Sequence, residues 1–249
     1  MFIFGSIYFY IDGVPAISNF VVNRLPTSID KEVGQEVRKQ ILNGAPIDEE
    51  KTELLKEFYD ELNYSSTTKI YVVKANEFNA FALPDNSIFV FDKVLKDVNS
   101  YQELAALLAH EYSHIKYRHG MKGIAQSLSW GLLAELLSGG DNSDNFIRSS
   151  SLLLTLKNSR AFETQADLGG LELLKEQHID QSGMTDLFQT MLKLPQENKS
   201  QTPSYLSTHP ATEKRLEKVE EVIKEKPSDS KMNNKLERIF SELTNTDVR

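Results

Sequence analysis

The run HEYSH at residues 110–114 contains the side chains with the clearest potential for chemistry. On a helix, His110 and His114 lie on the same face about one turn apart, so their imidazole nitrogens can bind one Zn²⁺ together. Glu111 then flanks the metal, where its carboxylate can take a proton from a zinc-bound water. The spacing therefore indicates hydrolysis by a metal-activated water.

The sequence around HEYSH predicts one well-defined helix over residues 100–120. Ser100 suits the N-cap, and Glu103 three residues later completes a capping box. Apolar residues at helical spacing form a stripe that indicates burial: Leu104, Leu107, Leu108 and Ile115. Gly120 is a suitable terminator after two basic residues. A buried, well-capped helix holds a pair of ligands rigidly, as a metal site requires.

A third ligand must come from another part of the sequence, because catalytic zinc usually takes three protein ligands and a water. His119 follows His114 by five residues, whereas metzincin peptidases place their third histidine six residues after the second, behind a glycine turn. We therefore interpret His119 as a surface residue at the helix end, facing away from the metal. Glu135 is a further candidate, but no acidic residue follows it one turn later.

Glu163 is the better candidate for the third ligand. Residues 159–174 predict a clear helix, and Asp167 lies one turn after Glu163 on the same face. One carboxylate can then bind the metal while the other orients a ligating histidine. Without the HEYSH helix, the same pair would indicate only an acidic, solvent-exposed face.

Four segments in a fixed order resemble a known family. They are NAFALPDNSIFVF (79–91), HEYSH (110–114), SRAFETQAD (159–167) and STHPATEKR (207–215). Together they resemble the gluzincin peptidases grouped with HtpX and the CAAX prenyl protease, and most of all the soluble bacterial members of the BepA and LoiP type. The resemblance spans about residues 30–216. Members often carry glycines where this chain has Asp85 and Asn86, and asparagine also suits a turn with positive φ.

The resemblance implies a role for each residue at the metal. His110, His114 and Glu163 would bind one Zn²⁺ per chain, and Glu111 would be the general base. Asp167 would not bind the metal itself but would orient a ligating histidine.

The resemblance also implies that His209 approaches the zinc from the opposite side. It would either stabilise the oxyanion of the tetrahedral intermediate or bind zinc as a fourth ligand and hold the enzyme latent. Arg215, the family arginine after this histidine, would anchor its loop through a carboxylate. The alternative for both residues is ordinary, since Pro210 can open a helix with His209 at its cap.

The segment at residues 79–83 has an expected use in substrate binding. Peptidases of this kind bind an extended peptide along an exposed sheet edge beside the metal, through main-chain hydrogen bonds that tolerate many side chains. Asn79 and Ala80 are the candidates for that edge, and the partners would be proteins or peptides bound as an extended strand. The alternative is a plain core strand, which the apolar Phe81 and Phe89 would also suit.

These features predict an α+β, mostly helical fold of the zincin (gluzincin) type, with a small, mostly antiparallel sheet beside the active-site helix. Helices are expected at 29–43 (capped near Ser28) and 48–63 (capped by Asp48), and strands at 68–75, 79–83 and 87–91. The expected organisation is an apolar N-terminal segment at 1–28, a zinc metallopeptidase domain at 29–216 and a charged helical extension at 217–249.

Two of three further segments leave alternatives open. The apolar residues 1–11 are too few to span a bilayer, and they suit either the tail of a membrane helix or a strand packed on the domain. Residues 121–157 suit a helical pair that roofs the cleft or a membrane-facing hairpin. Residues 195–208 suit a loop that covers the site.

Composition limits the function classes. The net charge of −8 argues against nucleic acid or an anionic membrane surface as the main partner, and the absence of cysteine excludes disulfides and thiol catalysis.

The expected function is a zinc metalloendopeptidase for quality control of envelope or membrane-associated proteins. The alternative is a catalytically latent zinc-site protein with a chaperone or scaffold role. The resemblance implies the bacterial cell envelope, with membrane association through the N-terminus and the cytoplasm as the alternative location.

Overall fold

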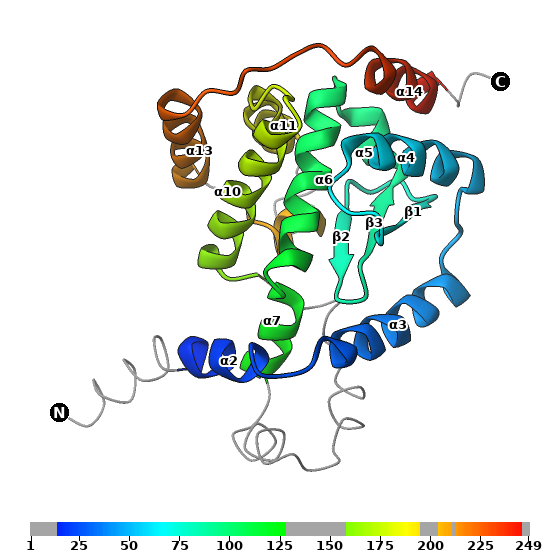
Figure 1. The fold of residues 1–249 in the computed structure, drawn as a ribbon. Helices are drawn as coiled ribbons and strands as arrows, with labels where there is room; N and C mark the ends of the chain where they lie inside the picture. Colours follow the sequence, from blue (N-terminus) through cyan, green and yellow to red (C-terminus); the bar gives the residue numbers. More distant parts are fainter. Residues whose placement is uncertain (1–13, 128–157, 195–203, 211–212, 246–249) are drawn as a thin grey trace.

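A three-stranded sheet lies beside one central helix in the computed structural model, which describes residues 14–127, 158–194, 204–210 and 213–245 (Figure 1). The central helix is α6 (Tyr101–Lys116), and it carries the HEYSH run. It packs between the sheet on one side and α10 (Arg160–Glu176) and α11 (Ser182–Lys193) on the other. The predicted fold class, α+β and mostly helical, is confirmed.

Side-chain caps start several of the helices that the sequence pattern predicts. Asp48 accepts a hydrogen bond from Lys51 N at the start of α4 (Glu49–Leu62), and Ser100 accepts one from Glu103 N at the start of α6. The Glu103 carboxylate accepts from the backbone N–H of Asn99 at 2.8 Å, one residue before the N-cap that the capping box would use. Helix α3 (Thr27–Gly44) begins after Pro26 without a side-chain cap, so the prediction of a cap near Ser28 was wrong.

The sheet consists of β1 (Lys69–Val73), β2 (Ala80–Leu83) and β3 (Ser87–Phe91) in the order β1-β3-β2. Strands β2 and β3 are antiparallel, but β1 and β3 are parallel, so the expected mostly antiparallel sheet is in fact mixed. The reason is the connection after β1, which carries the chain past the position of β3 and places β2 on its far side. Strand β2 is therefore an edge of the described sheet.

The two faces of the sheet bury different clusters. Side chains of one face, including Ile70 and Val90, join the main core with α4 and α6. Side chains of the other face, including Val73 and Phe89, pack against Val37 of α3. The edge strand β2 thus lies between α3 and the helix that carries HEYSH.

Two adjacent glycines bring α10 close to α6. A Cβ on Gly169 would lie 2.8 Å from Ser113 Oγ, and one on Gly170 would lie 3.4 Å from His110 N. The close approach places Glu163, one to two turns earlier on α10, beside the histidines of α6. The absence of side chains at these two positions therefore lets the two ligand-bearing helices approach closely.

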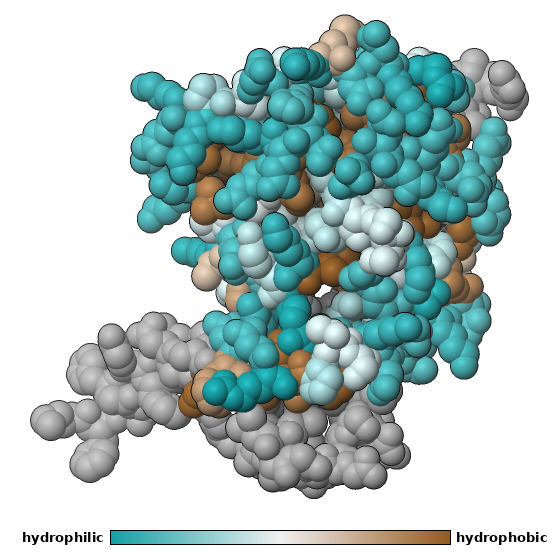
Figure 2. Space-filling view, in the orientation of Figure 1, coloured by the Kyte–Doolittle hydropathy of each residue, from teal (hydrophilic) through white to brown (hydrophobic). Residues whose placement is uncertain are grey.

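The remaining described elements surround this centre. They are α2 (Val14–Val22), α5 (Asp92–Asp97), α7 (His119–Ser127), α12 (Ser204–Thr208), α13 (Glu213–Glu225) and α14 (Asn234–Asn245). The apolar face of α14, with Leu236, Ile239, Phe240 and Leu243, is buried in the main core. Hydrophilic residues cover most of the face seen in Figure 2. No described helix is long and apolar enough to cross a bilayer.

Several expectations lie outside the described residues. They concern Glu135, the apolar residues 1–11, most of the segment at 121–157 and most of the loop at 195–208.

Candidate metal centre

Four buried side chains converge where α6, α10 and the segment after α12 meet. His110 and His114 come from α6, Glu163 comes from the first turn of α10, and His209 directly follows α12. Each offers one ligand atom, and these atoms all lie within 4.8 Å of one another. The structure thus brings together the two histidines, the glutamate and the third histidine that the sequence singled out.

The separations within this cluster suit a single small cation. His114 Nε2 lies 3.1 Å from His110 Nε2 and 3.4 Å from Glu163 Oε1. His209 Nδ1 lies 3.1 Å from Glu163 Oε1 and 3.4 Å from His110 Nε2. Ligands in a tetrahedron around zinc, with bonds of about 2.0–2.1 Å, are about 3.3–3.4 Å apart. The donor set and its spacing therefore fit Zn²⁺.

Asp167 and Arg215 hold the outer side of this cluster. Asp167 Oδ1 lies 3.0 Å from His110 Nδ1 and accepts from Arg215 Nη2 at 2.7 Å. Arg215 also pairs with Glu163 Oε2 at 2.7 Å and donates to the carbonyl of Pro210 at 2.7 Å. The guanidinium thus links both carboxylates of α10 to the segment that carries His209, in line with its expected anchoring role.

Glu111 lies against this cluster with one oxygen available. Its Oε1 accepts a hydrogen bond from the Tyr205 hydroxyl at 3.2 Å. Its Oε2 is buried and has no hydrogen-bond partner among the described residues. An unpartnered buried carboxylate oxygen is costly unless it faces something absent from the protein chain, such as a water molecule. This arrangement suits a base that acts on a water.

Burial and charge set the protonation of the ligands. Burial lowers the pKa of the His114 imidazole well below its usual value, which keeps it neutral, as metal binding requires. Burial alone would lower the pKa of His209, but the carboxylates of Glu163 and Glu111 outweigh it and raise that pKa. Burial would likewise raise the pKa of Glu163, but His209 and the other histidines lower it below the usual range.

His119 is not the surface residue that the sequence indicated. It is only 1% exposed, and its Nδ1 lies 2.9 Å from His114 Nδ1. The prediction was wrong because it assumed one continuous helix to Gly120. Helix α6 instead ends at Lys116, Arg118 adopts a left-handed conformation with φ of 57°, and His119 begins α7. This break turns His119 back toward the site.

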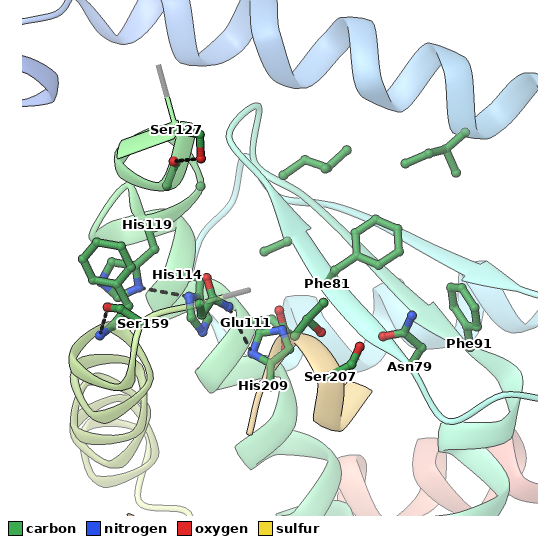
Figure 3. A pocket seen from close by; sticks show the side chains of 18 of the residues that line it. Asn79, Phe81, Phe91, Glu111, His114, His119, Ser127, Ser159, Ser207 and His209 are labelled. Carbon is green, nitrogen blue, oxygen red and sulfur yellow. Dashed lines mark hydrogen bonds and ion pairs between the residues drawn. The ribbon is translucent and has the colours of Figure 1, made fainter. Parts of the chain in front are cut away.

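A cleft of about 640 Å³ opens beside Glu111, His114 and His209 (Figure 3). Residues Asn79 to Leu83, with the exception of Ala80, contribute to its wall. Asn79 O accepts from Phe91 N at 2.9 Å, so Asn79 and Phe91 form a hydrogen-bonded pair of the antiparallel ladder. Main-chain groups in such a ladder alternate in direction, so those of Ala80 and Ala82 point away from β3, toward the free edge.

A model of peptidase family M48 matches residues 48–223. The chain belongs to peptidase family M48. This membership confirms the family indicated by the four motifs, and it confirms the expected class of a metal-dependent endopeptidase.

Relatives within M48 come from mitochondria and bacteria. The chain is 26% identical to the mitochondrial metalloendopeptidase OMA1 of Schizosaccharomyces pombe, over 89% of this chain and 69% of that protein. It is 33% identical to OMA1 of Arabidopsis thaliana, over 59% of this chain and 30% of that protein. It is 25% identical to the metalloprotease LoiP of Escherichia coli, over 61% of this chain and 60% of that protein.

Sequence reasoning missed two residues of this M48 site. Tyr205 donates to Glu111 and stacks on His209, with ring centroids 4.6 Å apart. Gln165 lies 3.0 Å from His119 through its side-chain oxygen. Tyr205 is one turn before His209, and Gln165 lies between Glu163 and Asp167, so proximity to the candidate ligands was the available signal.

Proposed function

We propose that this chain is a zinc-dependent endopeptidase in which His110, His114 and Glu163 hold one Zn²⁺. The observation that carries the proposal is the cluster of four buried ligand atoms within 4.8 Å of one another, with the unpartnered oxygen of Glu111 beside it. A binding protein would need only the ligands, whereas a base with a free oxygen next to them suits hydrolysis.

The chain's own residues supply the proton transfers. When bound, a zinc ion would polarise the scissile carbonyl and make a water acidic enough to lose a proton near neutral pH. Glu111 would accept that proton at Oε2 as the water oxygen attacks the carbonyl carbon, and would deliver it to the amine nitrogen as the C–N bond breaks. Asp167 Oδ1 lies 3.0 Å from His110 Nδ1, beside the nitrogen that would carry the ring proton when Nε2 binds the metal. Arg215 balances the charge of Asp167 and Glu163.

Metal removal tests this proposal. Treatment with a chelator is expected to remove one zinc per chain and to abolish cleavage of casein, and added Zn²⁺ is expected to restore both. Elemental analysis and a casein assay measure the two quantities on the same sample. Full cleavage by metal-free protein would overturn the proposal.

We propose that His209 in the present arrangement is a fourth ligand that holds the enzyme latent. Its Nδ1 is 3.1 Å from Glu163 Oε1 and belongs to the same ligand cluster. An oxyanion stabiliser would instead leave the fourth position to water and substrate. This observation favours the latent state over the oxyanion role for the described conformation.

We propose that substrates bind as an extended strand along β2. The main-chain groups of Ala82, which point away from β3, would pair with the peptide, and Asn79 also lines the cleft. Ala80, the other candidate, is fully buried and lies outside the cleft wall, so the structure does not favour it as a contact. Backbone pairing does not depend on the substrate's side chains, which suits a quality-control peptidase.

Among the relatives are a mitochondrial metalloendopeptidase and a beta-barrel assembly-enhancing protease. We therefore propose envelope or membrane-associated proteins as substrates and the cell envelope as the location.

Ala82→Pro tests this binding edge. The substitution removes an N–H that points to the free edge, so the pairing of β2 with β3 is expected to remain. We expect kcat/KM for a peptide substrate to fall about tenfold, the effect of one lost main-chain hydrogen bond. Ala82→Val is the control, because it adds bulk but keeps the N–H. Equal activity of the two variants, at equal zinc content and melting temperature, would contradict binding along β2.

A further inference from the structure

His119 contacts the ring of His114 on the side that faces away from His110 and Glu163. The ring of His114 presents Nε2 to His110 and Glu163, at 3.1 and 3.4 Å. Its other nitrogen, Nδ1, lies 2.9 Å from His119 Nδ1 (Figure 3). His119 Nε2 in turn lies 3.0 Å from Gln165 Oε1. Three side chains from α6, α7 and α10 therefore form one hydrogen-bonded row.

The direction of these hydrogen bonds follows from the donors and acceptors. If Nε2 of His114 binds a metal, its ring proton must sit on Nδ1 and be donated to His119 Nδ1. His119 must then carry its own proton on Nε2, and Gln165 Oε1 is an acceptor at the right place. The reverse orientation of the Gln165 amide would place a proton on His114 Nε2 and block it as a ligand.

We propose that His119 and Gln165 are positioning residues that fix the tautomer and the orientation of His114, as Asp167 does for His110. This inference rests on the proposed metal site. Each histidine of HEYSH then has its own hydrogen-bonding partner at Nδ1. For His110 the partner is the Asp167 carboxylate, and for His114 it is the neutral ring of His119, which is held by the Gln165 amide. Such supports typically change metal affinity about 10–100-fold when they are removed.

Packing around the His119 ring supports a fixed orientation. The ring stacks on Phe162, with centroids 4.4 Å apart and planes at 11°, and on Tyr117 at 5.7 Å. Phe162 directly precedes Glu163, so the stack ties the support of His114 to the helix that carries the carboxylate ligand. The stacks hold the plane of the ring, and the hydrogen-bond partners His114 and Gln165 fix where its two nitrogens point.

The backbone break at Arg118 is what brings His119 to this place. The Arg118 guanidinium pairs with both carboxylate oxygens of Asp30, at 2.7 and 2.6 Å, and donates to the carbonyls of Val22 and Leu25. These contacts compensate for the left-handed conformation of Arg118. The start of the chain's described part thus holds the turn that delivers His119 to His114.

Matched variants separate hydrogen bonding from packing. His119→Phe keeps a flat ring against Phe162 but removes the acceptor, whereas His119→Asn can place an amide oxygen near the position of Nδ1. Competition with a chromophoric chelator is expected to show zinc affinity about 10–100-fold weaker in His119→Phe, with most of the loss recovered in His119→Asn. The visible spectrum of the Co²⁺-loaded protein is expected to shift in His119→Phe only.

Gln165 gives a second, independent pair on an exposed residue. Gln165→Glu keeps an acceptor for His119 and is expected to bind zinc as tightly as the wild type, while Gln165→Met is expected to bind it about three- to tenfold more weakly. This pair decides the question if His119→Phe fails to fold. His178→Phe, at an exposed histidine beyond α10, is the control for loss of a histidine.

The outcomes distinguish this inference from the proposed function. Equal zinc affinity in His119→Phe and the wild type would overturn it. So would equal losses in His119→Phe and His119→Asn together with no difference between the two Gln165 variants, because that pattern indicates packing alone. A wild-type chain that binds no zinc would overturn the proposed metal site itself.

Discussion

Glu111→Gln is expected to lower kcat for peptide hydrolysis at least ~100-fold while the protein keeps its fold and its zinc. The amide has nearly the same shape, so Tyr205 can still donate to the side-chain oxygen that replaces Oε1. The amide cannot accept a proton at the other position, where Oε2 is unpartnered. Only the proton transfer is therefore removed.

Three measurements on one preparation check this expectation. They are zinc content, melting temperature and the initial rate of casein cleavage, each beside the wild type. The matched control is Glu103→Gln, a buried glutamate on the same helix whose carboxylate serves the N-terminal cap. Unchanged peptidase activity in Glu111→Gln would refute Glu111 as the base, and loss of zinc would show that Glu111 has a structural part in the site.

His209→Ala is expected to raise the initial rate of casein cleavage about tenfold, with zinc retained on His110, His114 and Glu163. The expectation follows from the position of His209 in the ligand cluster, because a ligand that occupies the fourth position reduces the fraction of competent enzyme. Removal of this ring frees that position for water and substrate. His209→Ala also removes the ring on which Tyr205 stacks, and this loss can disturb the hydrogen bond from Tyr205 to Glu111. Tyr205→Phe removes that hydrogen bond alone, so it measures this part of the effect separately.

The same variant also discriminates between the two roles of His209. If the ring stabilises the oxyanion, His209→Ala is expected to lower kcat about 10²–10³-fold, as removal of an oxyanion donor does elsewhere. Activity and zinc content measured together separate the two roles. A fall in rate at full zinc content would contradict the latent state.

Local signals in the sequence predicted the elements that carry the ligands. Ser100 caps α6 as predicted, and Ser159, where the second helix was predicted to begin, caps α10. An HExxH spacing on a helix requires its histidines to share one face. The juxtaposition of Glu163 with His114 also followed, because both histidines and the acidic pair needed one common centre. The caps and the helix face depend only on neighbouring residues, and the meeting of Glu163 with the histidines follows from the need of one metal ion for all its ligands. Such features can be predicted from the sequence.

Long-range contacts decided what the sequence could not indicate. At the break after Lys116, Arg118 pairs with Asp30, 88 residues away, and neither residue of the break, Tyr117 or Arg118, is a glycine. The parallel pairing of β1 with β3 depends on which side of β3 the chain passes. Tyr205 donates to Glu111 from 94 residues away in the sequence, and Arg215 holds the carbonyl of Pro210 next to His209 in the same segment. A single sequence does not reveal such partners in advance.

The most direct test of the central claim is a zinc anomalous-difference map from crystals of the zinc-loaded protein. The account predicts one peak per chain, bonded to Nε2 of His110, Nε2 of His114 and a carboxylate oxygen of Glu163, with Nδ1 of His209 as the fourth ligand in the latent state. A peak that lacks any of the first three ligands, or a zinc-loaded crystal with no peak between α6 and α10, would contradict it.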